Sequence, residues 1–371
     1  MTPTDDEVRR YLSRLADLPG PTTREEIRAT MAGRKAEELR ANRDTLRRVE
    51  ARAIRLIARP DYRSIRPTLR WVAPRDRPVW RYLRATVSSA PFTGAPGRWL
   101  PAFAVDEASG GILGVVELRS DISALGPRDR AIGWTHDDRF RRGRLRSVAG
   151  LSTCVAVPPF GALTGVKAMA AMVTSTEAAR AWEGAYGDPL AAVATTALYG
   201  KSSAYNRLRE WDYVGVSTGA SAFHLPDAHV RWLSRWLTAT GRDSGAYWGT
   251  SGSGGGRYVV VRTAAHAFGF DLDDVFSRQP RGVYLALLGD SAGPYLRCER
   301  DALTPDTEPL AAKVDYWLDR WYAMRLPKVS DRIDAFDPDA FRVDRALADA
   351  DRLYRDAPPV PDLPDRDEAT L

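Results

Sequence analysis

LAAVATTALYGKSSAYNRLREWDYVGVSTG, residues Leu190–Gly219, is the stretch that decides the fold. Its pattern predicts, in order, a buried strand, a polar loop, one or two helical turns and an aromatic strand, over Leu190–Leu198, Tyr199–Ser203, Ala204–Trp211 and Tyr213–Ser217. A strand that ends in such a loop and runs into a helix start forms a pocket at the carboxyl edge of a sheet. There the loop hydroxyls, Lys201 and free helix N–H groups would point outward.

The segments before this stretch extend the same architecture. A hairpin is predicted over Ala102–Asp106 and Gly111–Arg119, and a short extended piece over Ala131–Trp134. A buried strand over Leu151–Val157 then precedes helices over Gly161–Val173 and Thr176–Tyr186. Strands that alternate with helices in this order predict an α/β fold, with a mixed sheet flanked by helices.

The flanking regions divide the chain into four predicted parts. Residues 5–18 and 23–58 have helical spacing, whereas residues 60–101 are rich in Pro, Arg and Trp and are expected to be irregular with short helical pieces. Further helices are predicted over 226–245 and 310–325. We therefore expect a basic helical arm and connector (1–100), an α/β core (101–225), a helical extension (226–330) and an acidic, partly disordered tail (331–371).

Charge is spread unevenly over these parts. The net charge is +6, but residues 1–90 carry 21 Arg or Lys against 12 Asp or Glu, a balance of +9. Residues 301–371 carry 10 against 17, a balance of −7. A basic front and an acidic tail suggest contact with a polyanion, most simply DNA, which the tail would shield. The alternative is compositional, because only five of the basic residues are lysines.

Composition argues against a membrane or secreted protein. No apolar run approaches the roughly eighteen residues of a membrane span, and the start MTPTDDEVRR has no apolar signal core. Cys154 and Cys298 lack metal-like spacing and are expected to be buried free thiols. We expect a cytoplasmic protein with no membrane partner.

The loop after the first quoted strand contains the strongest site candidates. Ser203 and Tyr205 could position or transfer a proton, and Ser202 could do the same. Lys201 and Arg207 could bind phosphate, and Asn206 could read a base edge. The alternative is structural, with a serine that caps a helix and a tyrosine that packs in the core.

A second candidate surface is basic and aromatic. Arg141, Arg142 and Arg144 lie close in sequence to Trp134, and arginines beside aromatic rings suit phosphate contacts and base stacking. A solvated loop is the alternative. His136-Asp137-Asp138 could begin a metal site, but no second cluster supports it, so we expect no metal.

Several of these motifs resemble, in the same order, the DruA-like family of bacterial and phage proteins, which includes Druantia anti-phage proteins and proteins encoded beside transposases. The matching segments are GGILGVVELRS (Gly110–Ser120), GPRDRAIGWT (Gly126–Thr135), LSTCVAVPPFGALTGVKAMA (Leu151–Ala170) and the stretch from Trp182 to Gly219. The resemblance implies a role in phage defence or mobile-element biology. It also implies a GNAT-like (acetyltransferase-type) core similar to that of the phage DNA adenine-modifying protein Mom.

The GNAT resemblance implies further site residues and three functional alternatives. Gly161, Gly165 and Lys167 occupy the place of a pyrophosphate loop, where acetyl-CoA would bind. The stretch lacks the basic start and the glycine spacing of the acyl-CoA pattern, however, and close helix–strand packing is the favoured explanation of the glycines. Glu117, on a strand, could act as a general base. The leading hypothesis is a nucleic-acid-binding protein that modifies a base. The alternatives are an acyl-CoA-dependent N-acyltransferase acting on a small molecule, and a scaffold that recruits a helicase or transposase.

Overall fold

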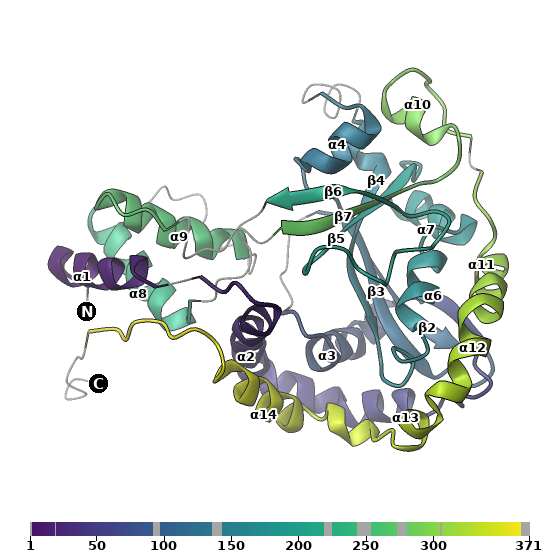
Figure 1. Ribbon diagram of the computed structural model, residues 1–371, viewed down its shortest axis with the longest axis horizontal. Coiled ribbons are helices and arrows are strands. Elements are labelled where there is room, and N and C mark those ends of the chain that lie inside the picture. Colours follow the sequence, from purple (N-terminus) through teal and green to yellow (C-terminus); the bar gives the residue numbers. More distant parts are fainter. Residues whose placement is uncertain are drawn as a thin grey trace.

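The structure is a computed structural model and describes residues 2–18, 20–91, 97–135, 143–218, 225–242, 254–272, 280–304 and 306–364. Within these residues, seven strands form one mixed sheet in the order β1-β2-β3-β4-β5-β7-β6 (Figure 1). The strands are β1 (Pro67–Trp71), β2 (Trp99–Asp106), β3 (Ile112–Ser120), β4 (Val148–Ala156), β5 (Ala192–Ala197), β6 (Asp212–Thr218) and β7 (Pro280–Leu287). Neighbours are antiparallel except β4 and β5, which are parallel.

Helices cover both faces of this sheet, which confirms the predicted α/β fold class. One face packs against α6 (Gly165–Met172), α7 (Thr176–Tyr186) and α11 (Leu310–Trp317). The other face packs against α2 (Arg24–Ile57) and α3 (Arg77–Val87) and, nearer β6, against α4 (Gly126–Ile132) and α10 (Ala292–Leu296). No helix in the described part of the chain is long and apolar enough to cross a membrane.

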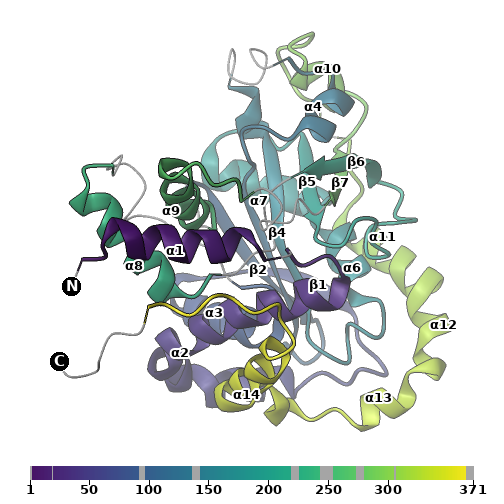
Figure 2. The same cartoon turned by 60° about the vertical axis from the view of Figure 1, so that its left-hand side comes forward.

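A smaller core lies apart from the sheet. It joins α1 (Asp5–Ala16), α8 (Asp227–Ala239) and α9 (Gly254–Ala267), which lie side by side in Figures 1 and 2. Capping boxes begin the first two helices, with Thr4 and Glu7 at α1 and Thr23 and Glu26 at α2. Each box satisfies N–H groups that a helix start otherwise leaves unpaired, and so the sequence places these two starts accurately.

The acidic C-terminal region that we expected forms helices over part of its length. It contains α12 (Ala323–Arg325), α13 (Ser330–Asp334) and α14 (Val343–Tyr354), joined by the short turns η4 (Leu326–Lys328) and η5 (Pro338–Phe341). α14 packs on α2, where Arg43 and Arg47 pair with Asp344 and Arg40 pairs with Asp351. The acidic residues of 331–354 are therefore part of a packed helical layer, although their charge alone suggested a tail.

Two other local predictions were wrong, and a third was correct only in part. The connector 60–101 contains helical pieces as expected, the turn η1 (Pro74–Asp76) and the amphipathic helix α3, whose tryptophan Trp80 is fully buried, but it also contains the strand β1. Residues 131–134 end α4 rather than extend, because Gly133 takes a left-handed conformation that stops the helix. Residues 204–211 form successive turns and no helix, since Arg207 also has a left-handed φ of 66°.

Candidate functional site

The only parallel strand pair of the described sheet sits at its centre and separates quickly. β4 pairs with β5 over Val148–Gly150 and Ala192–Ala194, and one further hydrogen bond joins Thr195 Oγ1 to the Leu151 carbonyl at 2.8 Å. Parallel strands that part leave a site at their carboxyl ends. The predicted loop Tyr199–Ser203 begins at that edge, directly after β5.

The loop is held against β7 by backbone contact and by one tyrosine. A Cβ at Gly282 would lie 2.3 Å from the Gly200 carbonyl oxygen, so the two segments approach as closely as glycine allows. The Tyr284 hydroxyl accepts a hydrogen bond from the Ser202 N–H at 2.7 Å and donates one to Asn206 Oδ1 at 3.0 Å. Asn206 is thus already engaged within the protein through its side-chain oxygen.

Tyr205, a predicted catalytic residue, points into the core. Only 8% of it is exposed, and its ring packs against Trp211 at 5.2 Å and Tyr284 at 5.0 Å between centroids. Burial raises the pKa of its hydroxyl. Ser203, in contrast, lies exposed on the loop surface.

Cations surround this loop, and most of them stack on half-buried aromatic rings. The distances from the cation to the ring centroid are 4.7 Å for Arg24 on Tyr199, 4.6 Å for Lys201 on Tyr213, 4.2 Å for Arg209 on Tyr316, and 5.1 and 5.6 Å for Lys167 and Arg320 on Trp321. Together with Arg207, these cations and their rings are called the cation–aromatic strip, namely Arg24, Lys167, Lys201, Arg207, Arg209, Arg320, Tyr199, Tyr213, Tyr316 and Trp321.

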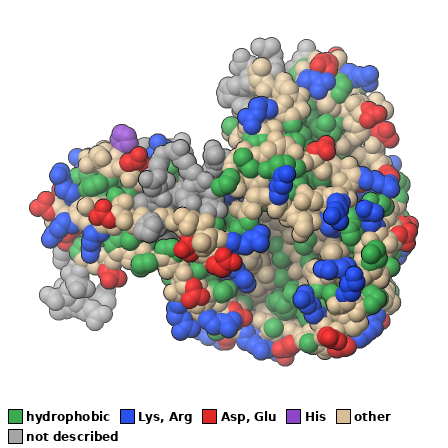
Figure 3. All heavy atoms as spheres, viewed as in Figure 1, with side chains coloured by type: hydrophobic (Ala, Val, Ile, Leu, Met, Phe, Trp, Pro, Cys, Tyr) green, Lys and Arg blue, Asp and Glu red, His purple; other side chains and the backbone are tan. Residues whose placement is uncertain are grey.

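The cations of the strip have no carboxylate partners. Among the described residues, none of the six forms an ion pair with Asp or Glu. The adjacent carboxylate of Glu210 is taken by Lys313. Figure 3 shows many Lys and Arg side chains over the larger body of the molecule, with Asp and Glu side chains among them and along its edges. The loop therefore lies in a positively charged surface.

Lys167 is the one cation of the strip that is buried. It lies in the first turn of α6, with 8% of the residue exposed, and its Nζ donates to the Asn206 carbonyl. Burial, reinforced by the positive charges of Arg207 and Arg320, lowers the pKa of its amine to about 8. An amine in this state changes its charge near neutral pH.

The glycines predicted to hold a pyrophosphate fill packing roles here. A Cβ at Gly165 would come within 2.4–2.5 Å of the Phe160 ring, and the Gly165 N–H donates to the Phe160 carbonyl at 2.9 Å. The Gly161 N–H points to the Val157 carbonyl at 3.4 Å. Phe160 is fully buried against Trp317. These contacts favour the packing alternative for both glycines.

Glu117 lies on the other face of the sheet from Tyr205. Its neighbours Val116 and Leu118 belong to the core that contains Tyr205, and alternation along β3 turns Glu117 the opposite way. There it accepts hydrogen bonds from Ser152 at 2.9 Å and Thr153 at 3.4 Å and pairs with Arg119. The three predicted catalytic residues therefore do not share one pocket.

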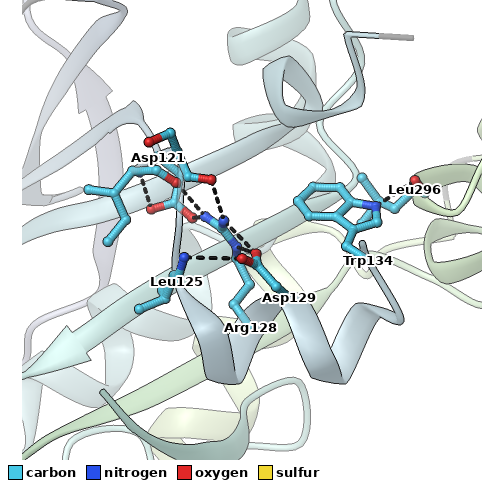
Figure 4. Close-up of polar contacts among 8 residues, drawn as sticks. Asp121, Leu125, Arg128, Asp129, Trp134 and Leu296 are labelled. Carbon is cyan, nitrogen blue, oxygen red and sulfur yellow. Dashed lines mark hydrogen bonds and ion pairs between the residues drawn. The ribbon is translucent and has the colours of Figure 1, made fainter. Parts of the chain in front are cut away.

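The second predicted surface is divided in the same way. Trp134 is buried, its Nε1 donates to the Leu296 carbonyl at 2.7 Å, and nearby Arg128 is held between Asp121 and Asp129 (Figure 4). Arg144 is buried too, 3.8 Å from the Tyr295 ring centroid. Both residues stabilise the packing of α4 and α10. Arg141, Arg142 and His136–Asp138 lie outside the described residues.

Half of the strip was missed by the sequence reasoning. The missed residues come from five segments of the chain. The start of α2 supplies Arg24, the loop before β6 supplies Arg209, and β6 supplies Tyr213. Helix α11 supplies Tyr316, and the π-helical turn η3 (Leu318–Tyr322) supplies Arg320 and Trp321. No spacing rule joins segments so far apart in the chain. The usable signal was weaker, namely an aromatic residue close to an arginine in Tyr316–Trp321.

Comparison with known proteins places the chain in a family. It matches the family model described as Druantia protein DruA over residues 21–297. It is similar to the Druantia protein DruA of Escherichia coli (strain UMEA 4076-1), with 27% identity over 336 residues that cover 83% of this chain and 81% of that protein. No solved structure gives a significant match. Because the family model spans more than half of its length, the chain belongs to the DruA family of Druantia anti-phage proteins.

Proposed function

We propose that this DruA-family chain binds nucleic acid, and that the cation–aromatic strip is its contact surface. The observation that carries the proposal is the absence of acidic partners for six clustered cations within the described part of the chain. Like charges repel one another, and a polyanion relieves this repulsion by replacing condensed counterions on its phosphates. The DruA family's place in anti-phage systems makes phage nucleic acid a natural ligand.

The aromatic rings suit a nucleic acid better than a small anion. Each ring is half-buried, so the protein holds it in place while one part of it stays at the surface. The ring can therefore fix the position of the cation above it. An arginine held flat over a ring presents its own plane to a base and its N–H groups to a phosphate. A row of such pairs tracks a backbone with little dependence on sequence.

The arrangement favours binding over a reaction on a base. Tyr205 is buried, and Glu117 lies on the opposite face of the sheet in an ion pair with Arg119. Of the three predicted catalytic residues only Ser203 is exposed near the strip. The mixed sheet with its single described parallel pair is compatible with the GNAT-like core that we predicted, but the packing of Gly165 on Phe160 does not favour acetyl-CoA.

The test is a salt titration of binding to single- and double-stranded DNA. For the wild type, affinity should fall linearly on a log–log plot as salt rises. Lys201→Gln with Arg209→Gln should weaken binding by roughly tenfold or more and should flatten the slope by about 0.7 to 0.9 for each phosphate that the variant no longer neutralises. As the matched control, Arg43→Gln with Arg47→Gln removes the same charge from arginines already paired with Asp344.

Two results would contradict the proposal. The first is no binding by the wild type at low salt. The second is an equal reduction in the strip variant and in the control, since that would mean that only the overall charge matters. Tyr205→Phe should leave affinity unchanged, because its hydroxyl faces the core and not the strip.

A further inference from the structure

One end of the strip brings three cations close together, two of them on a single ring. Lys167 Nζ and the Arg320 guanidinium lie 5.1 and 5.6 Å from the Trp321 centroid. The Lys167 amine also donates to the carbonyl of Asn206, whose next residue in the chain is Arg207. Three segments, α6, the loop after β5 and the turn η3, therefore bring one cation each to the same place.

Nothing in the described protein neutralises these three cations. The carboxylates on the adjoining segments are used elsewhere, with Glu210 on Lys313 and Asp315 on Arg66. Asp319, beside Arg320 in the same turn, forms no ion pair with a described residue. Three uncompensated positive charges held this close favour the arrival of an anion.

The backbone is unusual at two of the three positions. Arg207 takes a left-handed φ of 66°, which is strained for a residue other than glycine. Arg320 and Trp321 belong to a π-helical turn, a rare conformation that frequently occurs at functional sites. The π-helical turn supplies Arg320 and the Trp321 ring that Lys167 also contacts, and Arg207 directly follows the carbonyl that accepts from Lys167. Strain retained in this way is typical of ligand contacts.

We propose that Lys167, Arg207 and Arg320 form a seat for one phosphate group. The inference rests on the proposed function and adds to it a defined contact point. Two guanidinium forks supply paired N–H donors, and the amine adds a point charge from below. The Asn206 carbonyl holds the amine in place, and Trp321 fixes both the amine and Arg320.

A double-mutant cycle tests whether the two arginines share one phosphate. The variants are Arg207→Gln, Arg320→Gln and the pair, with Arg325→Gln as the matched control, since Arg325 is an exposed arginine of α12 outside the strip. Binding of a short mixed-sequence single-stranded oligonucleotide, with a 5′-hydroxyl or a 5′-phosphate, is followed by fluorescence anisotropy. Equal melting temperatures establish that the exposed substitutions leave the fold intact.

The seat predicts strong coupling between the two arginines. Each single change should weaken binding roughly five- to tenfold, and the pair should bind little more weakly than the worse single variant, because the seat is already broken. The control should weaken binding by less than about twofold. Coupling with both oligonucleotides assigns the seat to a backbone phosphodiester, and coupling only with the 5′-phosphate assigns it to a strand terminus.

Other outcomes would overturn the seat. If the two reductions in affinity multiply, each arginine contacts its own phosphate, and the seat fails while nucleic-acid binding stands. Reductions no larger than that of Arg325→Gln would exclude the seat in the same way. If the wild type binds neither oligonucleotide, both the seat and the proposed function fail.

Discussion

Two arginine-rich surfaces of this protein behave in opposite ways. On α2, Arg40, Arg43 and Arg47 reach across to the acidic helix α14, and Arg43 pairs with Asp344 at 2.8 Å. In the cation–aromatic strip, equally basic side chains stack on rings and have no carboxylate partner among the described residues. The comparison shows that the pairing of charges, not their number, marks a surface that is open to a polyanion.

This difference reverses the expectation raised by net charge. Residues 1–90 carry the larger excess of positive charge, yet much of it on α2 is matched by the C-terminal region. The strip draws on six separate segments, namely α2, α6, the loop between β5 and β6, β6, α11 and η3, and contains only six cations. Surface ion pairs contribute little stability each, and here their main effect is on where a ligand can bind.

The largest expected effect comes from Gly282→Ala, which should displace the loop of the strip while leaving all six of its cations in the sequence. The new Cβ would meet the Gly200 carbonyl at 2.3 Å, so the loop must move away from β7. We expect a decrease of about 2 kcal/mol in the free energy of unfolding and weaker DNA binding, measured by denaturant titration and anisotropy. Gly184→Ala is the control, because a Cβ at this position of α7 would meet no other atom. This substitution should stabilise the protein slightly. Equal effects of the two changes would refute the close contact.

The second effect is the pH dependence of DNA affinity, which comes from the loss of the positive charge on Lys167. The pKa of Lys167 is lowered to about 8, so its amine is charged below that pH and neutral above it. A bound phosphate favours the charged form, and affinity should therefore fall as pH rises from 7 to 9, by up to roughly tenfold. Lys167→Gln should bind more weakly and lack this dependence. An unchanged pH profile in that variant would assign the dependence to another group.

The third effect separates stability from binding at Arg207. Glycine adopts the left-handed conformation without strain, so Arg207→Gly should raise the free energy of unfolding by about 1 kcal/mol while DNA affinity falls. Thermal denaturation and anisotropy on the same samples provide both readouts. Arg209→Gly, at a residue without a positive φ, is the control and should not stabilise. A destabilised Arg207→Gly would mean that its side chain holds the loop.

The smallest expected effect comes from removing the carboxylate partner of two paired arginines on α2. Asp344→Asn removes the partner of Arg43 and Arg47 and should lower stability only slightly, because exposed ion pairs contribute little. If free cations mark a binding surface, this variant should bind DNA slightly more tightly at low salt, by roughly twofold. Tighter binding that persists at high salt would point to a cause other than charge.

The sequence predicted the sheet better than the site, and the reason lies in what each depends on. β4, β5, β6 and the β2–β3 hairpin are runs of apolar residues bounded by turns, and local pattern is enough to find them. The loop after β5 was found in the same way. By contrast, Trp134 and Arg144 read as binding residues because an aromatic residue among arginines looks the same whether it is exposed or packed on α10.

Glu117 and the distant half of the strip show the other limit. Side chains alternate along β3, so Glu117 lies on the opposite face from Val116. That this second face is covered by α3 follows only from the tertiary fold. Trp321 joins Lys167 only because α11 and η3 lie against α6. Such contacts arise from the tertiary fold, so no local pattern contains them.

The pairing of α14 with α2 has a consequence for synthesis of the protein. Asp351 is translated 311 residues after Arg40, its partner, and Asp344 follows Arg47 by 297 residues. Until the ribosome has made α14, the arginines of α2 therefore have neither of these acids to pair with. The nascent N-terminal region is thus more strongly basic before α14 is made, and the synthesis of α14 neutralises part of this charge.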